Sequence, residues 1–209
     1  MTEGSPHRLG IMLSGRGSNF LAIAEGIAQG RIPHTGIAVV ISNRRDAPGI
    51  AASRSAGLVT EVIEPRGRPR AEHDAEIVAS LQAHQVDLVC LAGYMRLLSA
   101  EFVRAFPQRI LNIHPSLLPA FPGLDAQRQA LAYGVTVSGC TVHFVDEELD
   151  HGVIVLQKAV PVLAGDDEHT LAARILAQEH GAYTEAIARV LSGEYRVDGR
   201  RYVPRSDGN

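Results

Sequence analysis

Residues 9–29, LGIMLSGRGSNFLAIAEGIAQ, carry the pattern that decides the fold. An apolar run at 9–13 ends in the glycine-rich segment SGRGSN, and an amphipathic stretch follows at 19–29. The apolar side chains of that stretch recur at helical spacing, at Phe20, Ile23, Ala24 and Ile27. The sequence therefore predicts a buried strand, a tight turn and a helix, which is the first unit of an alternating α/β fold.

The same alternation continues outward from this stretch. We expect further strands at 36–42, 58–63 and 86–93, separated by helices at 47–55 and 71–84. Strands without polar alternation, separated by helices, are typical of a parallel sheet covered on both faces. The expected later elements are a helix at 99–105 capped by Ser99, a strand at 109–114, a helix at 125–133, strands at 136–145 and 152–162, a helix at 167–191, and a hairpin turning at Asp198-Gly199.

Length and composition favour one ordinary globular domain, residues 1–209, in a reduced compartment. The net charge of −3 indicates no nucleic-acid partner. No apolar segment is long enough to span a membrane, and the N-terminus lacks the pattern of a secretory signal. Cys90 and Cys140 lie in apolar stretches and are expected to be buried free thiols, with no metal site. We therefore expect a cytoplasmic protein.

The segment SGRGSN could hold an anion. Gly15 and Gly17 allow close backbone approach to a ligand, and the start of the following helix offers free N–H groups and a partial positive charge. Ser18 and Asn19 add side-chain donors. Phosphate is the natural partner, although the spacing is neither a dinucleotide fingerprint nor a Walker loop. The alternative is a tight strand–helix turn without a ligand.

Two further segments could carry acyl-transfer chemistry. In LNIHPSLLP, Asn112 and His114 are two residues apart on an expected strand, so their side chains share a face. An amide can stabilise an oxyanion while an imidazole moves protons near neutral pH. In DEELDHG, Asp150 lies between two expected strands, where it could orient His114 and favour its imidazolium form. The alternatives are a satisfied polar strand end and a solvated acidic loop. With no G-x-S-x-G, direct transfer to a bound acceptor is preferred.

The ordered set of motifs resembles the glycinamide ribonucleotide transformylase family. The similarity extends from LGIMLSGRGSN to AQEHGAYTEAI, nearly the whole chain, and rests on GRGSN, LAGYMRLLS, LNIHPSLLP, FPGLDAQRQAL, TVHFVDEELDHG and ILAQEH in the family's order. It implies a Rossmann-like single-domain fold with a phosphate-binding half (1–100) and a catalytic, folate-binding half (101–209). It also implies transfer of a formyl group from 10-formyltetrahydrofolate to the amine of glycinamide ribonucleotide, in purine synthesis.

The resemblance also assigns site residues. It implies that Asn112, His114 and Asp150 are catalytic and that Leu118-Pro119 is a cis peptide. The residues it matches to the ribonucleotide site are Gly17, Ser18, Asn19, Leu176, Ala177, Gln178 and Glu179. The residues it matches to the folate site are Arg70, Met95, Arg96, Leu97, Leu98, Asn112, Asp146, Glu147, Glu148, Leu149 and Asp150. Many relatives carry histidine where Asp125 stands, which puts in doubt for this chain any pH-dependent ordering of that loop that a histidine would confer.

Other functions remain as alternatives. A formyltetrahydrofolate hydrolase shares the catalytic residues but would carry an extra N-terminal domain, and a formyltransferase could use a different amine acceptor. Methionyl-tRNA formyltransferase would need a C-terminal RNA-binding domain and a basic surface. A non-catalytic ligand-binding protein would need a broken catalytic centre, whereas Asn112, His114 and Asp150 are all present. The expected oligomeric state is a monomer or a weak homodimer.

Overall fold

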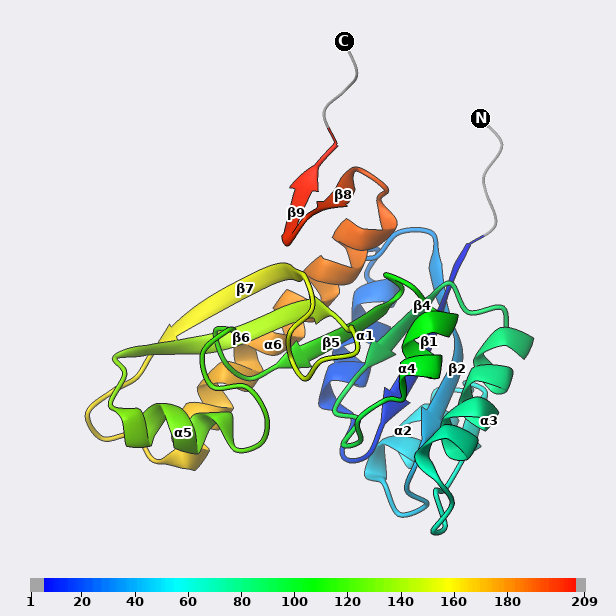
Figure 1. Ribbon diagram of the computed structural model, residues 1–209, viewed down its shortest axis with the longest axis horizontal. Coiled ribbons are helices and arrows are strands. Elements are labelled where there is room, and N and C mark those ends of the chain that lie inside the picture. The colour runs from blue at the N-terminus through cyan, green and yellow to red at the C-terminus, as the bar shows by residue number, and fades with distance from the viewer. Residues whose placement is uncertain (1–5, 206–209) are drawn as a thin grey trace. The chain divides into compact units, whose positions relative to one another are not determined.

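A computed structural model describes residues 6–205 of the chain. The chain forms two compact units, Met1–Leu111 and Asn112–Asn209, and the boundary falls within strand β5. Helices and strands alternate as the sequence predicts (Figure 1). The elements of the first unit are β1 (His7–Leu13), α1 (Ser18–Ala28), β2 (Thr35–Ser42), α2 (Pro48–Ser55), β3 (Thr60–Val62), α3 (Arg70–Ala83), β4 (Leu88–Leu91), α4 (Ala100–Ala105) and the start of β5 (Ile110–His114).

The first unit is a parallel, Rossmann-like sheet. Its strand order is β3-β2-β1-β4, with β5 next to β4, and the pairs β1/β2, β1/β4 and β2/β3 are all parallel. Helix α1 packs beside α2, and α3 packs beside α4. Since parallel crossovers are right-handed, the reversal of direction after β3 puts these two helix pairs on opposite faces of the sheet. The prediction of a mostly parallel sheet with helices on both faces is confirmed.

Two glycines explain how this unit packs so closely. A Cβ at Gly10, in the middle of β1, would lie 2.5 Å from a methyl group of Leu81 on α3, so the helix can approach the strand only over a glycine. Gly17 ends the turn after β1 with φ +73°, which is the left-handed region that glycine adopts without strain. The predicted tight turn between strand and helix is thereby confirmed.

The second unit is a more irregular sheet crossed by one long helix. Its strands run in the order β5-β6-β7-β9-β8, with β6/β7 and β8/β9 antiparallel and β7/β9 parallel. Helix α6 packs on β6 and β7 and buries an apolar face that includes Leu171, Ile175 and Ile187. The elements are α5 (Ala126–Tyr133), β6 (Val137–Phe144), β7 (Ile154–Pro161), α6 (Glu168–Leu191), β8 (Tyr195–Asp198) and β9 (Arg201–Pro204).

Several local predictions are confirmed. Ser99 caps α4 and accepts a hydrogen bond from the Phe102 N–H, and the Leu118-Pro119 peptide is cis. Both cysteines are free and buried, and burial raises the pKa of the Cys140 thiol to about 11. The last two strands form a hairpin that turns where Asp198-Gly199 predicts it.

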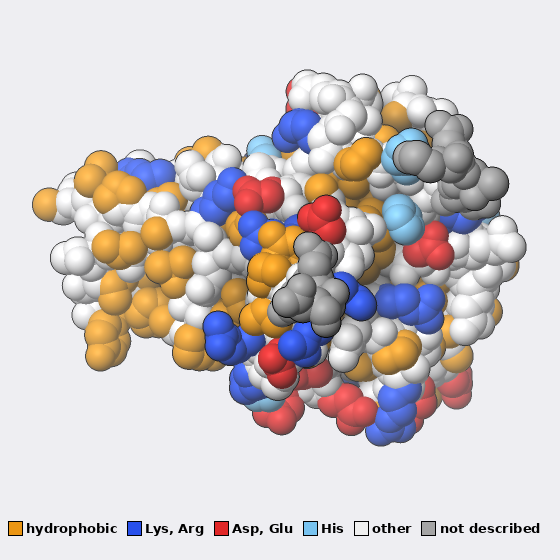
Figure 2. Space-filling model, turned by 90° about the horizontal axis from the view of Figure 1, so that it is seen from above, with side chains coloured by type: hydrophobic (Ala, Val, Ile, Leu, Met, Phe, Trp, Pro, Cys, Tyr) orange, Lys and Arg blue, Asp and Glu red, His pale blue; other side chains and the backbone are white. Residues whose placement is uncertain are grey.

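The surface and the helices give two further observations. Figure 2 shows hydrophobic side chains gathered over the part of the second unit that carries α5, where Tyr133, Val137 and Leu163 are exposed. No helix within residues 6–205 is long and apolar enough to cross a membrane.

Candidate active site

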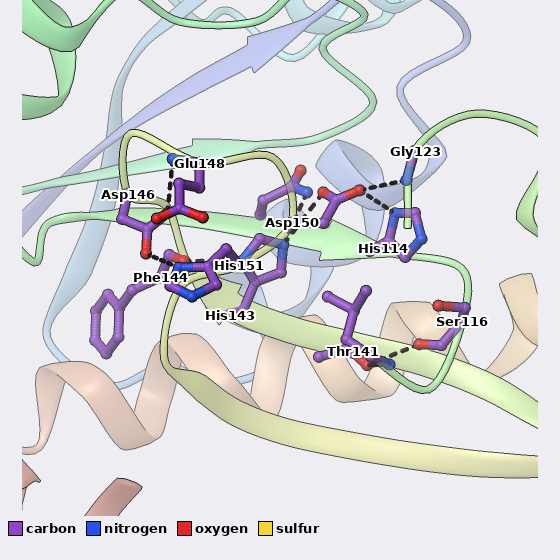
Figure 3. Close-up of polar contacts among 12 residues, drawn as sticks. His114, Ser116, Gly123, Thr141, His143, Phe144, Asp146, Glu148, Asp150 and His151 are labelled. Carbon is purple, nitrogen blue, oxygen red and sulfur yellow. Dashed lines mark hydrogen bonds and ion pairs between the residues drawn. The ribbon is translucent and has the colours of Figure 1, made fainter. Parts of the chain in front are cut away.

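Strand β5 presents Asn112 and His114 on one face, as their spacing predicts. His114 is 5% exposed and lies at the carboxyl end of the strand. Its Nδ1 atom lies 3.3 Å from Asp150 Oδ2 (Figure 3). Its Nε2 atom lies 2.9 Å from the Phe121 carbonyl oxygen. A carbonyl oxygen only accepts, so Nε2 carries a hydrogen. The Nδ1 atom faces the Asp150 carboxylate, so the ring is held between an acceptor on each side.

Asp150 is held by its backbone and by a loop N–H group. The residue follows the acidic loop 146–149 and has φ +50°, in the left-handed region that few non-glycine residues adopt. Its Oδ2 atom accepts a hydrogen bond of 2.8 Å from the Gly123 N–H, and its side chain is only 9% exposed. The loop after β5 therefore contacts both members of the pair, with the Phe121 carbonyl on His114 and the Gly123 N–H on Asp150.

His143, on β6, is a further member of this site that the sequence reasoning missed. Its Nδ1 atom lies 2.8 Å from the Phe144 carbonyl oxygen, so Nδ1 is the protonated nitrogen. Burial lowers the pKa of His143 below its ordinary value, which keeps the ring neutral and leaves Nε2 as an acceptor. Asn112 Nδ2 donates to that Nε2 atom at 3.2 Å. His143 thus fixes which way the Asn112 amide faces.

The segment after β5 is secured by hydrogen bonds around the buried Thr141 hydroxyl. The Thr141 hydroxyl donates to the Ser116 carbonyl oxygen at 2.7 Å and accepts from the Leu118 N–H at 3.0 Å. Gln157 Nε2 donates to the Leu118 carbonyl oxygen and to the Thr141 hydroxyl, each at 2.9 Å. Buried polar groups that are satisfied in this way rigidify their surroundings. The backbone that follows His114 is therefore firmly placed.

A hollow of about 520 Å³ in the second unit opens beside Asp150. Its walls mix apolar side chains with the carboxylate and one guanidinium. The lining residues are Leu118, Pro119, Pro122, Leu149, Asp150, His151, Gly152, Ile154 and Arg200. Within residues 6–205, no group of three or more His, Cys, Asp or Glu side chains is arranged to hold a metal ion. The chemistry available here is that of an amide donor, an imidazole and a carboxylate.

The other predicted residues of the second unit lie on two elements. Asp146, Glu147, Glu148 and Leu149 form the loop between β6 and β7, where Asp146 accepts from the Glu148 N–H at 3.0 Å. Leu176, Ala177, Gln178 and Glu179 lie in the middle of α6, where Glu179 is buried and Gln178 is exposed.

In the first unit, one serine joins two of the predicted segments. Gly17 precedes α1, and Ser18 and Asn19 are its first residues. Met95, Arg96, Leu97 and Leu98 form the connection from β4 to α4, while Arg70 is exposed at the start of α3. Ser14 Oγ accepts a hydrogen bond of 2.8 Å from the Met95 N–H, and the Ser14 N–H donates to the Gly93 carbonyl oxygen at 3.0 Å. The glycine-rich turn and the segment 95–98 are thus tied to a common residue.

Comparison with known proteins identifies the family. The family model described as formyl transferase matches residues 7–187, which is most of the chain. The chain belongs to the formyl transferase family. It is 40% identical over 203 residues to phosphoribosylglycinamide formyltransferase of Escherichia coli, and the match covers 93% of this chain and 95% of that protein.

Two further comparisons agree. The crystal structure of glycinamide ribonucleotide transformylase 1 from Symbiobacterium toebii is similar with a TM-score of 0.94 and 52% identity, covering 98% of this chain and 96% of that chain. The trifunctional purine biosynthetic protein adenosine-3 of Drosophila pseudoobscura is 47% identical over 193 residues, which is 90% of this chain. The chain spans only 14–19% of the length of the trifunctional proteins that it matches. The α/β fold is therefore that of the formyl transferases.

Proposed function

We propose that the protein transfers the formyl group of 10-formyltetrahydrofolate to the amine of 5'-phosphoribosylglycinamide. The products are formylglycinamide ribonucleotide and tetrahydrofolate, in the purine biosynthetic route. The observation that carries the proposal is the group formed by Asn112, His114, His143 and Asp150, in a chain that matches phosphoribosylglycinamide formyltransferase of Escherichia coli almost from end to end. The group supplies donors for an oxyanion and an acceptor for a proton.

The reaction needs no covalent intermediate on the protein. The amine lone pair attacks the formyl carbon, and the carbonyl electron pair moves onto the oxygen. The amine then loses its proton. The oxygen's electron pair re-forms the carbonyl as the bond from the formyl carbon to N10 of the folate breaks, and N10 gains a proton. Cys140 takes no part as a nucleophile, because its thiol is buried and its pKa is raised to about 11.

Asn112 and His114 provide the donors for the oxygen. Asn112 Nδ2 carries two hydrogens, of which one is used by His143, so the other is available to the oxyanion. The His114 Nε2–H donates to the Phe121 carbonyl oxygen in the substrate-free protein. To donate to the oxyanion, His114 exchanges that carbonyl for the substrate oxygen. Asn112 is thus directed before the substrate binds, which reduces reorganisation at that donor, whereas His114 must first release the Phe121 carbonyl oxygen.

Asp150 orients His114 and directs proton transfer. Its carboxylate faces the imidazole Nδ1 atom at 3.3 Å and lines the adjoining hollow, where a water could accept the proton of the amine. Positioning two bound substrates can supply on the order of 10⁵-fold or more in effective molarity. General acid–base assistance adds roughly 10²–10⁴-fold.

The remaining predicted residues are proposed to bind the two substrates. In the first unit, Gly17, Ser18 and Asn19 bind the phosphate through the start of α1, because free N–H groups and the helix dipole favour an anion there. Arg70 binds the folate side, and Met95, Arg96, Leu97 and Leu98 contact the pterin. In the second unit, Asp146, Glu147, Glu148, Leu149 and Asp150 serve the folate, and Leu176, Ala177, Gln178 and Glu179 serve the sugar and glycinamide.

The deciding experiment follows release of tetrahydrofolate by absorbance, with and without glycinamide ribonucleotide. Turnover that requires the ribonucleotide supports the transfer reaction. Release without it indicates a hydrolase, and formyl transfer only to another amine changes the acceptor. Absence of folate release under all these conditions contradicts the proposed activity. Mass spectrometry of the product, with formyl-labelled donor, identifies which nitrogen receives the group.

A further inference from the structure

The hairpin formed by β8 and β9 lies beyond the residues that the family model matches, yet it contacts the strand that follows the acidic loop. The family model ends at residue 187, and the hairpin begins at Tyr195. Arg201, the first residue of β9, pairs with Ile154, the first residue of β7. The hairpin is therefore bound to the sheet only a few residues after Asp150.

Arg200, in the turn of the hairpin, contacts His151 at the C-terminal end of the acidic loop. Its Nη1 atom lies 2.9 Å from His151 Nε2, and its Nη2 atom donates to the His151 carbonyl oxygen. A guanidinium has only donors, so His151 Nε2 accepts, and the hydrogen of a neutral ring is on Nδ1. That Nδ1 atom lies 2.8 Å from Asp146 Oδ2. A chain of hydrogen bonds thus leads from Arg200 through His151 to Asp146.

These hydrogen bonds connect the two ends of the acidic loop, Asp146 and His151. Asp146 begins the loop, and His151 follows Asp150 directly (Figure 3). Asp146 also accepts from the Glu148 N–H, so the loop is tied both internally and across its ends. Since Asp150 has φ +50°, its carboxylate direction depends on backbone that is held from outside the residue itself. The contacts of His151 restrain the peptide group next to it.

A second contact reaches the strand that leads into the loop. The ring of Tyr202, on β9, meets Phe144 edge to face, with centroids 5.6 Å apart, and Tyr195 stacks on Tyr202 at 5.3 Å. The carbonyl oxygen of Phe144 accepts the hydrogen bond that sets the tautomer of His143. The hairpin therefore contacts both sides of the loop, with Tyr202 before it and Arg200 after it.

We infer that Arg200 is a positioning residue for formyl transfer, which acts through His151 to hold the loop 146–150 and so the Asp150 carboxylate beside His114. The inference rests on the proposed function. Arg200 also lines the hollow next to Asp150, so its loss changes the wall of the site as well as the support of the loop. If the hairpin only covered the edge of the sheet, the contacts of the Arg200 side chain with His151 would not be required.

The first test compares Arg200→Ala with Arg201→Ala. Both variants remove one arginine from the same hairpin, and the Arg201 side chain is exposed. Arg200→Ala should lower kcat by roughly tenfold with an unchanged KM for the ribonucleotide, because a misplacement of about 1 Å can cost up to 10²-fold. Arg201→Ala should stay within about twofold. Equal kcat values in the two variants would overturn the inference.

A double-mutant cycle tests whether the effect passes through His151. If it does, Arg200→Ala combined with His151→Ala lowers kcat no further than the larger single effect, because the two side chains act in one chain of contacts. Independent effects on kcat would multiply, and multiplication would contradict a role through His151. Arg200→Lys keeps a donor for the His151 carbonyl oxygen but loses the fork of the guanidinium, so it should recover part of kcat.

Hydrogen–deuterium exchange separates this inference from the proposed function, since it needs neither substrate nor activity. Amides of residues 146–151 should exchange several-fold faster in Arg200→Ala than in the wild type, and at the wild-type rate in Arg201→Ala. A wild-type protein without transferase activity would contradict the proposed function. Faster exchange in Arg200→Ala would then still show that Arg200 holds the loop 146–150. If the exchange of residues 146–151 is unchanged in Arg200→Ala, Arg200 does not hold the loop and the inference is wrong. If exchange is faster but kcat of an active enzyme is unchanged, Arg200 holds the loop without positioning Asp150, and the inference is also wrong.

Discussion

Each unit of the protein contains a buried histidine–aspartate pair, and the two pairs have similar histidine-to-carboxylate and histidine-to-carbonyl distances. In the first unit, His73 Nδ1 lies 3.5 Å from Asp74 Oδ1, and His73 Nε2 lies 2.7 Å from the Ile63 carbonyl oxygen. In the second unit, the corresponding distances for His114 are 3.3 Å to Asp150 and 2.9 Å to the Phe121 carbonyl oxygen. A buried pair of this kind is therefore not sufficient to mark a catalytic site.

What differs is the backbone and the space around each carboxylate. Asp74 lies within helix α3, is 1% exposed, and accepts a hydrogen bond of 2.6 Å from the N–H of Ser99, the cap of α4. Asp150 follows a loop in a left-handed conformation and lines a hollow of about 520 Å³. Asp74 of the first pair links helices α3 and α4, whereas Asp150 of the second pair lines a hollow. The space beside the carboxylate and the loop that holds it, rather than the pair itself, distinguish a candidate catalytic pair from a structural one.

The largest expected effect is on turnover, at the second pair. His114→Ala should lower kcat by roughly 10²–10⁴-fold, the range for general acid–base groups, with a nearly unchanged urea midpoint. Steady-state kinetics with both substrates saturating measures the change. His169→Ala, an exposed histidine on α6 in the same unit, is the control and should remain within about twofold. Near-normal turnover of His114→Ala would remove His114 from the mechanism.

Substitution in the first pair, His73 and Asp74, should lower the stability of the protein rather than its turnover. His73→Ala removes a fully buried ring and its hydrogen bond to Ile63, so the free energy of unfolding should fall by about 2–4 kcal/mol. Urea unfolding measures it, and kcat of the folded fraction should stay within about threefold. His84→Ala, the cap residue of α3 with a part-exposed partner in Glu61, should cost less than about 1 kcal/mol. A stable but inactive His73→Ala protein would erase the distinction between the pairs.

His143 is a further difference between the two pairs, because the contacts described above give the first pair no second histidine that orients an amide. His143→Leu removes the acceptor that orients the Asn112 amide, so kcat should fall by roughly 10–100-fold while KM changes little. Combined with Asn112→Ala, it should add nothing to the effect of Asn112→Ala alone. Multiplying effects in the double variant would show that His143 acts on the reaction by another route.

Much of this arrangement could be predicted from residue patterns. The alternation of Asn112 and His114 placed both on one face of β5, and the acidic loop placed Asp150 at a strand end, because period two and strand-end loops are local properties. His143 escaped prediction, since one polar residue in the apolar run TVHFV has no local signal beyond its position just before the acidic loop.

The contacts made by loops could not be predicted either. The Phe121 carbonyl and the Gly123 N–H contact His114 and Asp150 from a segment in which residues 121 and 123 adopt positive φ, as residue 150 does, and such conformations depend on the tertiary surroundings. The meeting of Arg200 with His151, 49 residues apart, is likewise a product of strand pairing rather than of any local pattern. The residues were visible in the sequence, and their partners were not.

The smallest expected effect concerns the pH dependence of stability. Burial lowers the pKa of His143, so the folded protein keeps the ring neutral while the unfolded chain binds a proton near the ordinary pKa of 6.5. More protons are then bound in the unfolded state, and the stability contributed by this group is complete above that pH and is lost as the pH falls toward the lower folded pKa. The loss cannot exceed about 1.4 kcal/mol per pH unit for one proton. Urea unfolding from pH 8 to pH 5 should therefore show a shallower decline in His143→Leu than in the wild type, while groups elsewhere titrate equally in both. Parallel curves would mean that the pKa of His143 is the same in the folded and unfolded states, so burial would not be what keeps its Nε2 atom free to accept the Asn112 hydrogen bond that separates this site from the pair in the first unit.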